Sequence, residues 1–394
     1  MHNVLLNNSE FEQRPHVEVE QKFVPIFPEQ LDTWREASQP VEQLYLSHPS
    51  EEFSLRLRES FAANGDPMYT ATLKNRGEAT KNGLKRIEIE TDITAETYAI
   101  YRANGAYPVL QKLRACPVKN IDIDYYSNGD ITLESENPIS LSAFLDQHPI
   151  ILDERTGDKS VDNEHRAHFD YRKNRRGNET LIPIEQPDVA ISLAREIYKH
   201  HIDNTIVVAT IHGRSGSGKS TLVREITNEL DGVIPKIVTI STDDYHRGKT
   251  FLDAYNNGKP WKDWDAEIVY DIDALAADLD ALKNGESISS RMFNFTTQEP
   301  EVTGIIEPAK DRTLILVEGI YAGSRKFDSA AHVRHEVQTP LATSIGRRLA
   351  RDFSGERVND SLPDPEVVLR YLLENAEPAY QAQKTITRFS YVNI

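Results

Sequence analysis

Alternating apolar and charged positions run through the first third of the chain. In VEVEQKF, residues 17–23, the apolar side chains face one way and the charged ones the other, namely Glu18, Glu20 and Lys22. Six later segments alternate in a similar way: EEFSLRLRES, MYTATLKNRG, GLKRIEIETDI, PVLQKLRAC, NIDIDYYSNGD and ITLESENP. A period of two is typical of β-strands. The pattern predicts a mainly β region from residue 17 to about 137, whose charged faces would lie in water if the sheet were open.

The pattern changes between residues 137 and 184. The short apolar segment ISLSAFLDQHPI predicts a helix. Residues 153–180 then hold few aliphatic and many charged side chains, which is the composition of an exposed or disordered linker. Within it, HRAHFDYRKNRRG is either solvated linker or a basic docking patch. We therefore divide the chain into a first domain, a charged linker and a second domain, at 1–150, 151–184 and 185–394.

Helical patterns and fully apolar strands alternate after the linker. PDVAISLAREIYKHHI and YDIDALAADLDALKNGE carry apolar residues at helical spacing, and the second helix is expected to end at Asn284-Gly285. NTIVVATIHG and RTLILVEG are apolar runs typical of strands that are buried on both faces. This order predicts an α/β domain, in which helices cover both faces of a parallel sheet.

Composition agrees with two cytoplasmic domains. A chain of 394 residues is long for a single core, and 39% hydrophobic with 27% charged residues is typical of soluble globular proteins. No apolar run is long enough to cross a membrane, and the first 16 residues lack the features of a secretory signal. A single cysteine, Cys116, excludes an internal disulfide framework and fits a reducing cytoplasm.

The net charge of −17 argues against nucleic acid or an anionic membrane as a partner. An anionic ligand must therefore be met by local positive clusters. Composition leaves open whether the chain forms a homo-oligomer.

A phosphate-binding loop is the first such cluster. GRSGSGKS, residues 213–220, lies between the strand TIVVATI and the helix STLVREITNEL. Its glycines let backbone N–H groups converge on phosphate oxygens, and the helix N-terminus adds a favourable dipole. Lys219 would contact the outer phosphates of ATP as a catalytic group, and the Ser220 hydroxyl would bind Mg²⁺. The predicted ATP-binding residues are Gly213, Ser215, Gly216, Ser217, Gly218, Lys219, Ser220 and Thr221.

Two acids, Asp243 and Asp244, follow another apolar strand in IVTISTDDYHRG. They are expected at the carboxyl edge of the sheet, where open α/β sheets bind ligands. The phosphate-binding loop, STDDYH, DWDAEIVYDIDALAADLDALKNGE, LILVEGIYA and TPLATSIGRRLARD follow one another as in the uridine kinase and phosphoribulokinase family of P-loop kinases. Residues from about 185 to 394 therefore resemble that family.

The resemblance implies specific roles. Asp243 would be the base that orients the acceptor hydroxyl, Glu318 a carboxylate near Mg²⁺, and Asp271 the carboxylate that binds a ribose diol. Lid arginines would close over the phosphates, unless they form a solvated helix face: Arg347, Arg348 and Arg351. The family's His-Pro is Ala266-Glu267 here, and its base-recognising Tyr and His correspond to Phe293 and Gln298. The acceptor is then a nucleoside or another small hydroxyl-bearing metabolite.

Charged side chains recur on alternating positions of nearly every strand in the first domain: Arg56 and Arg58, Lys74, Arg86, Glu88 and Glu90, Lys112 and Arg114, Asp122 and Asp124, Glu134 and Glu136. A sheet that merely faced water would mix these with neutral polar residues. A closed antiparallel barrel offers an alternative, because its interior can enclose a polar channel. Like charges inside would need partners, which bound cations and a polyanion would supply.

This arrangement resembles the CYTH family of triphosphate tunnel metalloenzymes over residues 16 to about 150. EVEQK matches the ExExK signature, and RLR, TLK, RIEIE, QKLR, DID and ESE follow in family order. The resemblance implies metal-assisted attack of water on the terminal phosphoryl group of a triphosphate. Candidate ligands of Mg²⁺ or Mn²⁺ are Glu18, Glu20, Glu134 and Glu136, followed by Glu88, Glu90 and Asp124. The phosphate chain would be bound by Arg56, Arg58, Lys74, Arg86, Lys112 and Arg114.

Two points stay open within this resemblance. Lys22 would either orient the attacking water or balance the neighbouring acids. The family also includes adenylate cyclases and thiamine triphosphatases, and inorganic triphosphate is the least demanding substrate.

Three functions remain open at this stage. The chain is a bifunctional enzyme, triphosphatase and kinase; or its barrel is a polyphosphate or nucleotide sensor that regulates the kinase without turnover; or the barrel is catalytic and the P-loop domain is a regulatory nucleotide binder.

Overall fold

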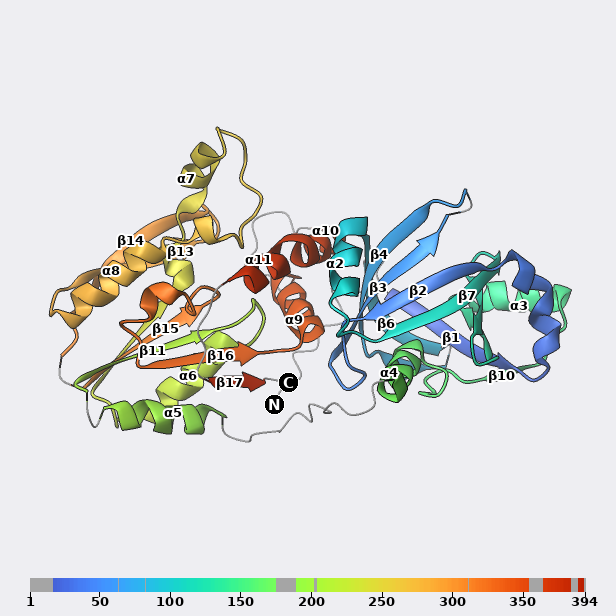
Figure 1. The fold of residues 1–394 in the computed structure, drawn as a ribbon, viewed down its shortest axis with the longest axis horizontal. Helices are drawn as coiled ribbons and strands as arrows, with labels where there is room; N and C mark the ends of the chain where they lie inside the picture. The colour runs from blue at the N-terminus through green and yellow to red at the C-terminus, as the bar shows by residue number, and fades with distance from the viewer. Residues whose placement is uncertain are drawn as a thin grey trace. The chain divides into compact units, whose positions relative to one another are not determined.

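The computed structural model describes residues 17–62, 64–81, 83–174, 189–201, 204–310, 312–353, 364–383 and 389–392. The chain divides into two compact units (Figure 1). The barrel unit comprises Met1–Thr180 and Asp364–Arg370, and the P-loop unit comprises Leu181–Pro363 and Tyr371–Ile394. No helix in the described ranges combines the length and apolarity that a membrane span requires.

Eight antiparallel strands close into a ring in the barrel unit. Their order around the ring is β1, β9, β8, β7, β2, β3, β4, β6 and back to β1. The strands are β1 Val17–Pro25, β2 Gln39–Tyr45, β3 Phe53–Phe61, β4 Pro67–Asn75, β6 Gly83–Asp92, β7 Val109–Val118, β8 Ile121–Tyr126 and β9 Ile131–Ser135. Two short strands extend the sheet, β5 Glu78–Thr80 beside β6 and β10 Leu152–Glu154 beside β1. The predicted antiparallel barrel is confirmed, and β2 is a strand that the alternation did not reveal.

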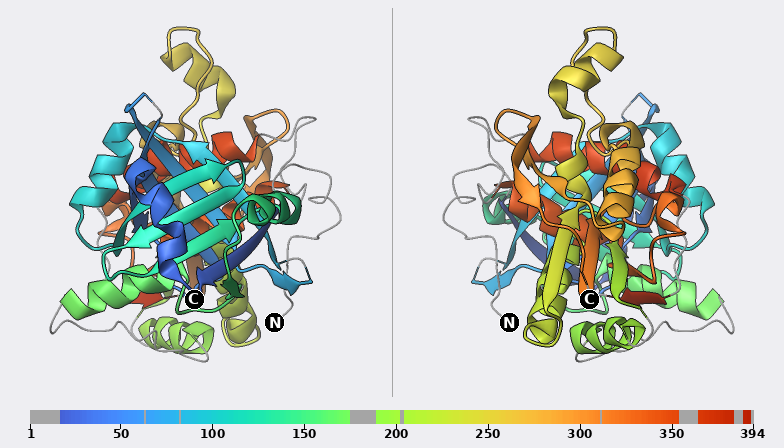
Figure 2. Two further views of the ribbon diagram at one scale, coloured as in Figure 1. Left: turned by 90° about the vertical axis from the view of Figure 1, so that its right-hand side faces the viewer. Right: turned by 90° about the vertical axis from the view of Figure 1, so that its left-hand side faces the viewer.

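The apolar faces of the strands point out of the barrel. Ile123 of β8 and Leu133 of β9 pack against Leu31 of the 3-10 helix η1 (Pro28–Ala37) and Phe144 of helix α3 (Pro138–Gln147). Figure 2, left, shows both helices lying against the outside of the strands. Because successive side chains alternate across a strand, the charged neighbours of these residues point inward. The open-sheet interpretation, with charges in water, is therefore wrong. Helix α2 (Ala95–Ala103) lies between β6 and β7 in the chain.

Residues 152–174 correct the predicted linker. They form β10, which pairs with β1, and helix α4, Asn163–Asn174. Glu164 and Ala167 are buried, and Glu164 accepts hydrogen bonds from Ser47 and Arg76. Composition failed here because polar contacts hold α4 to the barrel. Arg166, from the predicted basic docking patch, is paired with Asp130 at 2.7 Å. The part of the linker from 175 to 184 lies outside the described residues.

The P-loop unit contains a five-stranded parallel sheet in the order β12, β15, β11, β16, β17. These strands are Lys236–Ser241, Thr313–Gly319, Ile206–His212, Val333–Gln338 and Phe389–Val392. One apolar core lies between the sheet and helices α5 (Val189–His200) and α6 (Lys219–Leu230). A second core lies on the other face under helix α8 (Ile272–Lys283) and the hairpin of β13 (Ile288–Asn294) and β14 (Glu299–Ile306). The predicted parallel sheet with helices on both faces is confirmed.

Shorter elements connect and follow these strands along the chain. The 3-10 helix η2 (Thr242–Tyr245) follows β12, and helix α7 (Gly248–Tyr255) follows η2. Helix α9 (Leu341–Phe353) follows β16. The chain then forms α10 (Pro365–Tyr371), the π-helix η5 (Leu372–Ala376) and α11 (Glu377–Ala382). The 3-10 helices η3 (Glu267–Val269) and η4 (Arg325–Phe327) are connectors.

Candidate active sites

Charged side chains fill the interior of the barrel and pair across it. Lys74 of β4 lies 2.9 Å from Glu18 of β1 and 2.9 Å from Glu88 of β6. Arg86 also pairs with Glu18, at 3.0 Å, and contacts Glu20. The pair of Glu18 on β1 and Lys74 on β4 reaches past the intervening strand β6, which places both side chains on the concave side of the sheet. The structure therefore brings together the residues that the sequence predicted for this interior.

Two glutamates of this group, Glu18 and Glu88, lie close together. Burial, together with the neighbouring Glu18 carboxylate, raises the pKa of Glu88 to about 7. Against burial, Lys74 and Arg86 hold the pKa of Glu18 well below its usual range. Glu136 lies just past the end of β9 with an exposed side chain, and partial desolvation of its carboxylate together with the charge of Glu18 raises its pKa. Neighbouring carboxylates that repel one another are the donors that a divalent cation prefers.

No metal site is preassembled in the described ranges, because no three acidic, His or Cys side chains converge on one point. The carboxylates are paired instead with lysines and arginines. The donor chemistry fits Mg²⁺ or Mn²⁺, and the ion pairs would have to rearrange to admit either ion. Asp124 has the least freedom, since its oxygens accept from Arg114 at 2.6 and 2.7 Å and from Lys112. The side chains of Lys112 and Asp124 are both 0% exposed.

Two arginines present unsatisfied donors inside the barrel. Arg56 donates to Thr72 at 3.0 Å and Arg58 to Glu90 at 2.9 Å, but the Nε–H groups of both arginines are buried without a hydrogen-bond partner. Buried polar groups in proteins are nearly always satisfied, so an orphaned cationic donor marks a place where an anion fits. These two residues are the best-supported members of the predicted phosphate-binding set.

Lys22 lies among acidic side chains inside the barrel. Its ammonium lies 2.8 Å from Glu134 and 3.6 Å from Glu20, and it donates to the carbonyl of Val161. Against burial, the charges of Glu134 and Glu20 raise the pKa of Lys22, so the ammonium keeps its proton. Asn163 of α4 donates to Glu134 at 3.3 Å and so belongs to the same network. Sequence reasoning missed Asn163, because it fell in the predicted linker.

The phosphate-binding loop of the P-loop unit joins β11 to α6. Gly216 and Gly218 have φ values of 80° and 89°, which glycine adopts without strain. Lys219 is buried and donates to the carbonyl of Arg214 at 2.8 Å. The Ser220 hydroxyl donates to Glu318 at 3.2 Å. A hydroxyl and a carboxylate side by side fit the oxygen coordination of Mg²⁺, as the sequence predicted for these two residues.

Asp243 and Asp244, both on η2, have different surroundings. Asp244 accepts from the backbone N–H of Ser241 in a capping box, and burial raises its pKa to about 6. Asp243 lies near enough to Lys219 for its charge to act on that lysine: burial lowers the pKa of Lys219, and the negative charges of Glu318 and Asp243 oppose the change. The structure therefore groups Lys219, Asp243 and Glu318 at the carboxyl edge of the sheet.

The residues expected around the acceptor make contacts with other parts of the fold. Asp271 caps α8 through Ala274 and pairs with Arg247 at 3.1 Å. Phe293 is buried, with its ring centroid 4.0 Å from that of His246. Gln298 lies at the turn of the β13–β14 hairpin with φ 59°. Phe293 is therefore a buried side chain that packs against His246.

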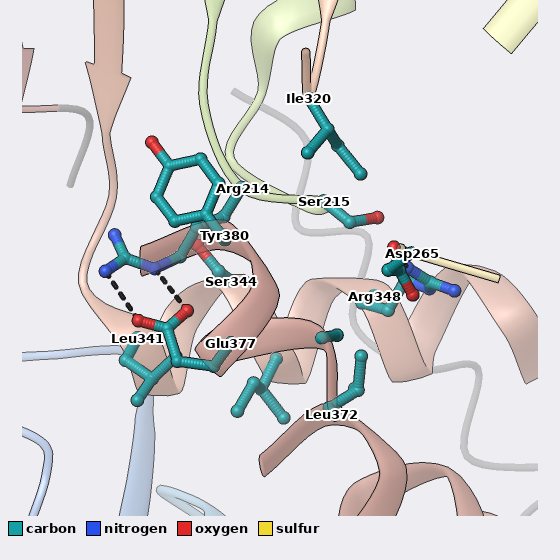
Figure 3. Close-up of a pocket in the computed structure, with 12 residues that line it drawn as sticks. Arg214, Ser215, Asp265, Ile320, Leu341, Ser344, Arg348, Leu372, Glu377 and Tyr380 are labelled. Atoms are coloured by element: carbon teal, nitrogen blue, oxygen red, sulfur yellow. Dashed lines mark hydrogen bonds and ion pairs between the residues drawn. The ribbon is translucent and has the colours of Figure 1, made fainter. Parts of the chain in front are cut away.

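A pocket lies beside the phosphate-binding loop (Figure 3). Arg348 of α9 lines it and pairs with Asp265 at 3.5 Å and Asp352 at 3.0 Å. Arg351 donates to the Ser215 hydroxyl at 3.4 Å, and Arg347 is half-buried. Two of the three predicted lid arginines thus reach the surroundings of the loop. Asp265 was not predicted as a site residue, although it lies in a segment that was recognised.

Comparison with known proteins concerns mainly the second half of the chain. Residues 208–359 match the Phosphoribulokinase / Uridine kinase family. A uridine kinase of Staphylococcus haemolyticus is 30% identical over 150 residues, which are 38% of this chain and 69% of that enzyme. A solved D-glycerate 3-kinase from Cryptococcus neoformans aligns over 52% of this chain and 96% of its own, with 11% identity and a TM-score of 0.40. A solved inorganic triphosphatase aligns over 38% and 93%, with 20% identity and a TM-score of 0.23.

Proposed function

Since the chain belongs, through residues 208–359, to the phosphoribulokinase and uridine kinase family, we propose that its P-loop unit transfers the terminal phosphoryl group of ATP to a hydroxyl of a small, nucleoside-like metabolite. The grouping of Lys219, Asp243 and the Ser220–Glu318 pair at one sheet edge is the observation that carries the proposal. A lysine for the phosphates, a carboxylate for the hydroxyl and a hydroxyl–carboxylate pair for Mg²⁺ are the parts that phosphoryl transfer requires.

In this reaction the acceptor oxygen attacks the γ-phosphorus, its proton passes to the Asp243 carboxylate, and the bond to the β-phosphate oxygen breaks to release ADP. Lys219 binds the outer phosphates, and Arg348 and Arg351 neutralise charge that develops on the transferring group. Ser220 and Glu318 would hold Mg²⁺, which neutralises phosphate charge when bound.

The test is ADP formation by the intact chain with ATP, Mg²⁺ and a panel of hydroxyl compounds that includes nucleosides. Lys219→Ala and Asp243→Asn should abolish turnover of any active compound. Asp244→Asn is the matched control, because its amide oxygen can still cap η2, and it should retain most activity. A panel with no active compound, or equal activity in Asp243→Asn, would contradict this function and favour a regulatory nucleotide-binding unit.

A second activity is proposed for the barrel unit, the hydrolysis of a triphosphate, with inorganic triphosphate as the simplest substrate. The unsatisfied Nε–H groups of Arg56 and Arg58 support a bound polyanion, and the Glu18–Glu88 pair supports a divalent cation. Water would attack the terminal phosphorus, and the bond to the bridging oxygen would break to release pyrophosphate. Lys22 would stay charged beside Glu134 and orient the water. Glu18 and Glu88, with Glu20 and Glu136 near them, would hold Mg²⁺ or Mn²⁺, which polarises the phosphoryl oxygen and activates water.

Phosphate release from inorganic triphosphate by the intact chain tests this second activity. Glu18→Gln should abolish release and Lys219→Ala should leave it unchanged, whereas the exposed Glu29→Gln on η1 is the control for loss of a glutamate. If triphosphate binds without release of phosphate and changes the rate of the kinase, the barrel is a sensor and not a hydrolase.

A further inference from the structure

Arg214, the second residue of the loop GRSGSGKS, is held by the C-terminal helix α11. The Glu377 carboxylate accepts from Arg214 Nε at 2.7 Å and from Nη2 at 2.8 Å (Figure 3). Glu377 is only 8% exposed, so this two-point ion pair is shielded from water. Such bidentate pairs fix the orientation of both groups as well as their distance.

Other side chains hold this pair in place. The ring of Tyr380 lies 4.9 Å from the Arg214 guanidinium carbon, and the Tyr380 hydroxyl donates to Glu336 at 2.7 Å. Gln381 donates to Glu377 at 2.7 Å. The guanidinium is thus held by a carboxylate and an aromatic face, both from α11.

The backbone of Arg214 belongs to the part of the loop that must receive the phosphates. Its carbonyl accepts from the Ser217 N–H at 3.1 Å and from the Lys219 ammonium at 2.8 Å. The position of Arg214 therefore sets both the turn that aims the loop N–H groups and the starting position of the lysine. A glycine-rich loop loses conformational entropy when it is ordered, and a side-chain anchor removes that cost before the ligand arrives.

We propose that Glu377 is a positioning residue for nucleotide binding, which acts through Arg214 to hold the phosphate-binding loop in its receptive conformation. This inference rests on the proposed binding of ATP to the same loop. Glu377 itself touches no nucleotide in this scheme, and the Arg214 guanidinium, already occupied by Glu377 and covered by Tyr380, is an anchor and not a phosphate ligand.

The test is titration calorimetry of the intact chain with ATP and Mg²⁺, which needs no knowledge of the acceptor. Glu377→Gln keeps the shape and removes the charge, and it should weaken ATP binding by about ten- to a hundredfold, the range for a lost charge-assisted hydrogen bond. Arg214→Ala should weaken it as much, the double variant no more than either single one, and Arg214→Lys should recover part of the affinity. Glu229→Gln, an exposed glutamate on α6, is the matched control and should bind like the wild type.

The outcomes separate this inference from the function on which it rests. If the wild type does not bind ATP, both fail. If the wild type binds and Glu377→Gln binds equally well, the inference alone fails, even where the variant melts at a lower temperature. Additive losses in the double variant, or a loss in Arg214→Ala without one in Glu377→Gln, would also overturn it, since the arginine would then act directly on the nucleotide.

Discussion

The buried ion pair of Lys112 and Asp124 makes the stability of the barrel depend on the charge of Asp124. Asp124→Asn keeps the volume of the side chain but removes the charge that Lys112 and Arg114 contact. Arg114 retains Glu134 at 2.8 Å, whereas the fully buried ammonium of Lys112 loses its ion-pair partner. Breaking a buried pair in this way costs about 3–5 kcal/mol. For a unit of this size the cost corresponds to a fall in melting temperature of roughly 6–20 °C.

The fall should depend on pH. Burial and the charge of Arg114 lower the pKa of Lys112 to about 8 in the wild type, from an ordinary value of 10.5. Between these two values the unfolded chain binds more protons than the folded one, so the contribution of Lys112 to stability rises with pH. Without Asp124 the pKa of Lys112 falls further, and the lysine can stay buried as the neutral amine. The difference between variant and wild type should therefore be largest near pH 7 and shrink toward pH 10.5.

The assay is thermal unfolding followed by the fluorescence of Trp34. Trp261→Phe and Trp264→Phe are introduced into the wild type and the variant, because these are the other two of the 3 tryptophans in the chain. Asp146→Asn, an exposed residue on α3, is the control. Equal melting temperatures for Asp124→Asn and Asp146→Asn at pH 7, or a difference that grows with pH, would refute the reasoning about Lys112.

Two further predictions test other parts of the structure. Burial and the neighbouring Glu18 raise the pKa of Glu88 to about 7 from an ordinary 4.5, so this residue favours folding below pH 4.5 and loses that contribution as the pH rises through 7. Glu88→Gln should therefore flatten the pH dependence of barrel melting over this window, and an unchanged curve would contradict the raised pKa of Glu88. A Cβ on Gly216 would lie 2.3 Å from the Ser344 carbonyl oxygen, whereas one on Gly232 meets nothing within 4 Å, although both glycines have positive φ. Gly216→Ala should therefore weaken ATP binding at least tenfold and Gly232→Ala should not, as titration with ATP would show; similar affinities would mean that the loop can move away from α9.

The charge alternation of the first domain carried most of the information about its fold. Arg56 and Arg58 alternate with Leu55 and Leu57, and a closed barrel brings the arginines together on its inside while both leucines are buried on its outer face. The strand β2 escaped notice because its sequence, QPVEQLY, buries both Leu44 and Tyr45 in succession and so does not alternate. Helix α4 escaped notice because Glu164 is anchored by Ser47 and Arg76, and such polar contacts leave no apolar signal.

The sequence identified candidate functional residues more reliably than it identified the residues with which they pair. Lys219, Ser220 and Glu318 could be assigned from motifs, since a strand, a loop and a helix in that order can assemble in few ways. The pairing of Arg214 with Glu377 could not be foreseen, because the two residues lie 163 positions apart and Glu377 belongs to no recognised motif. The burial of Phe293 against His246 likewise depends on how the hairpin folds over the sheet.

The closure of the barrel by its first strand affects how the chain can acquire its fold. The partners of β1 are β6, β9 and β10, all of which come later in the sequence, so β1 has no partner until β6 has been synthesised and its second edge stays unpaired until β9 follows. Ring closure is consequently a late, long-range event, and contacts of that kind slow folding. An exposed strand edge can also recruit another chain in the meantime. Refolding of this protein from denaturant should accordingly be slow, and its yield should fall as the protein concentration rises, because intermolecular strand pairing competes with the final step.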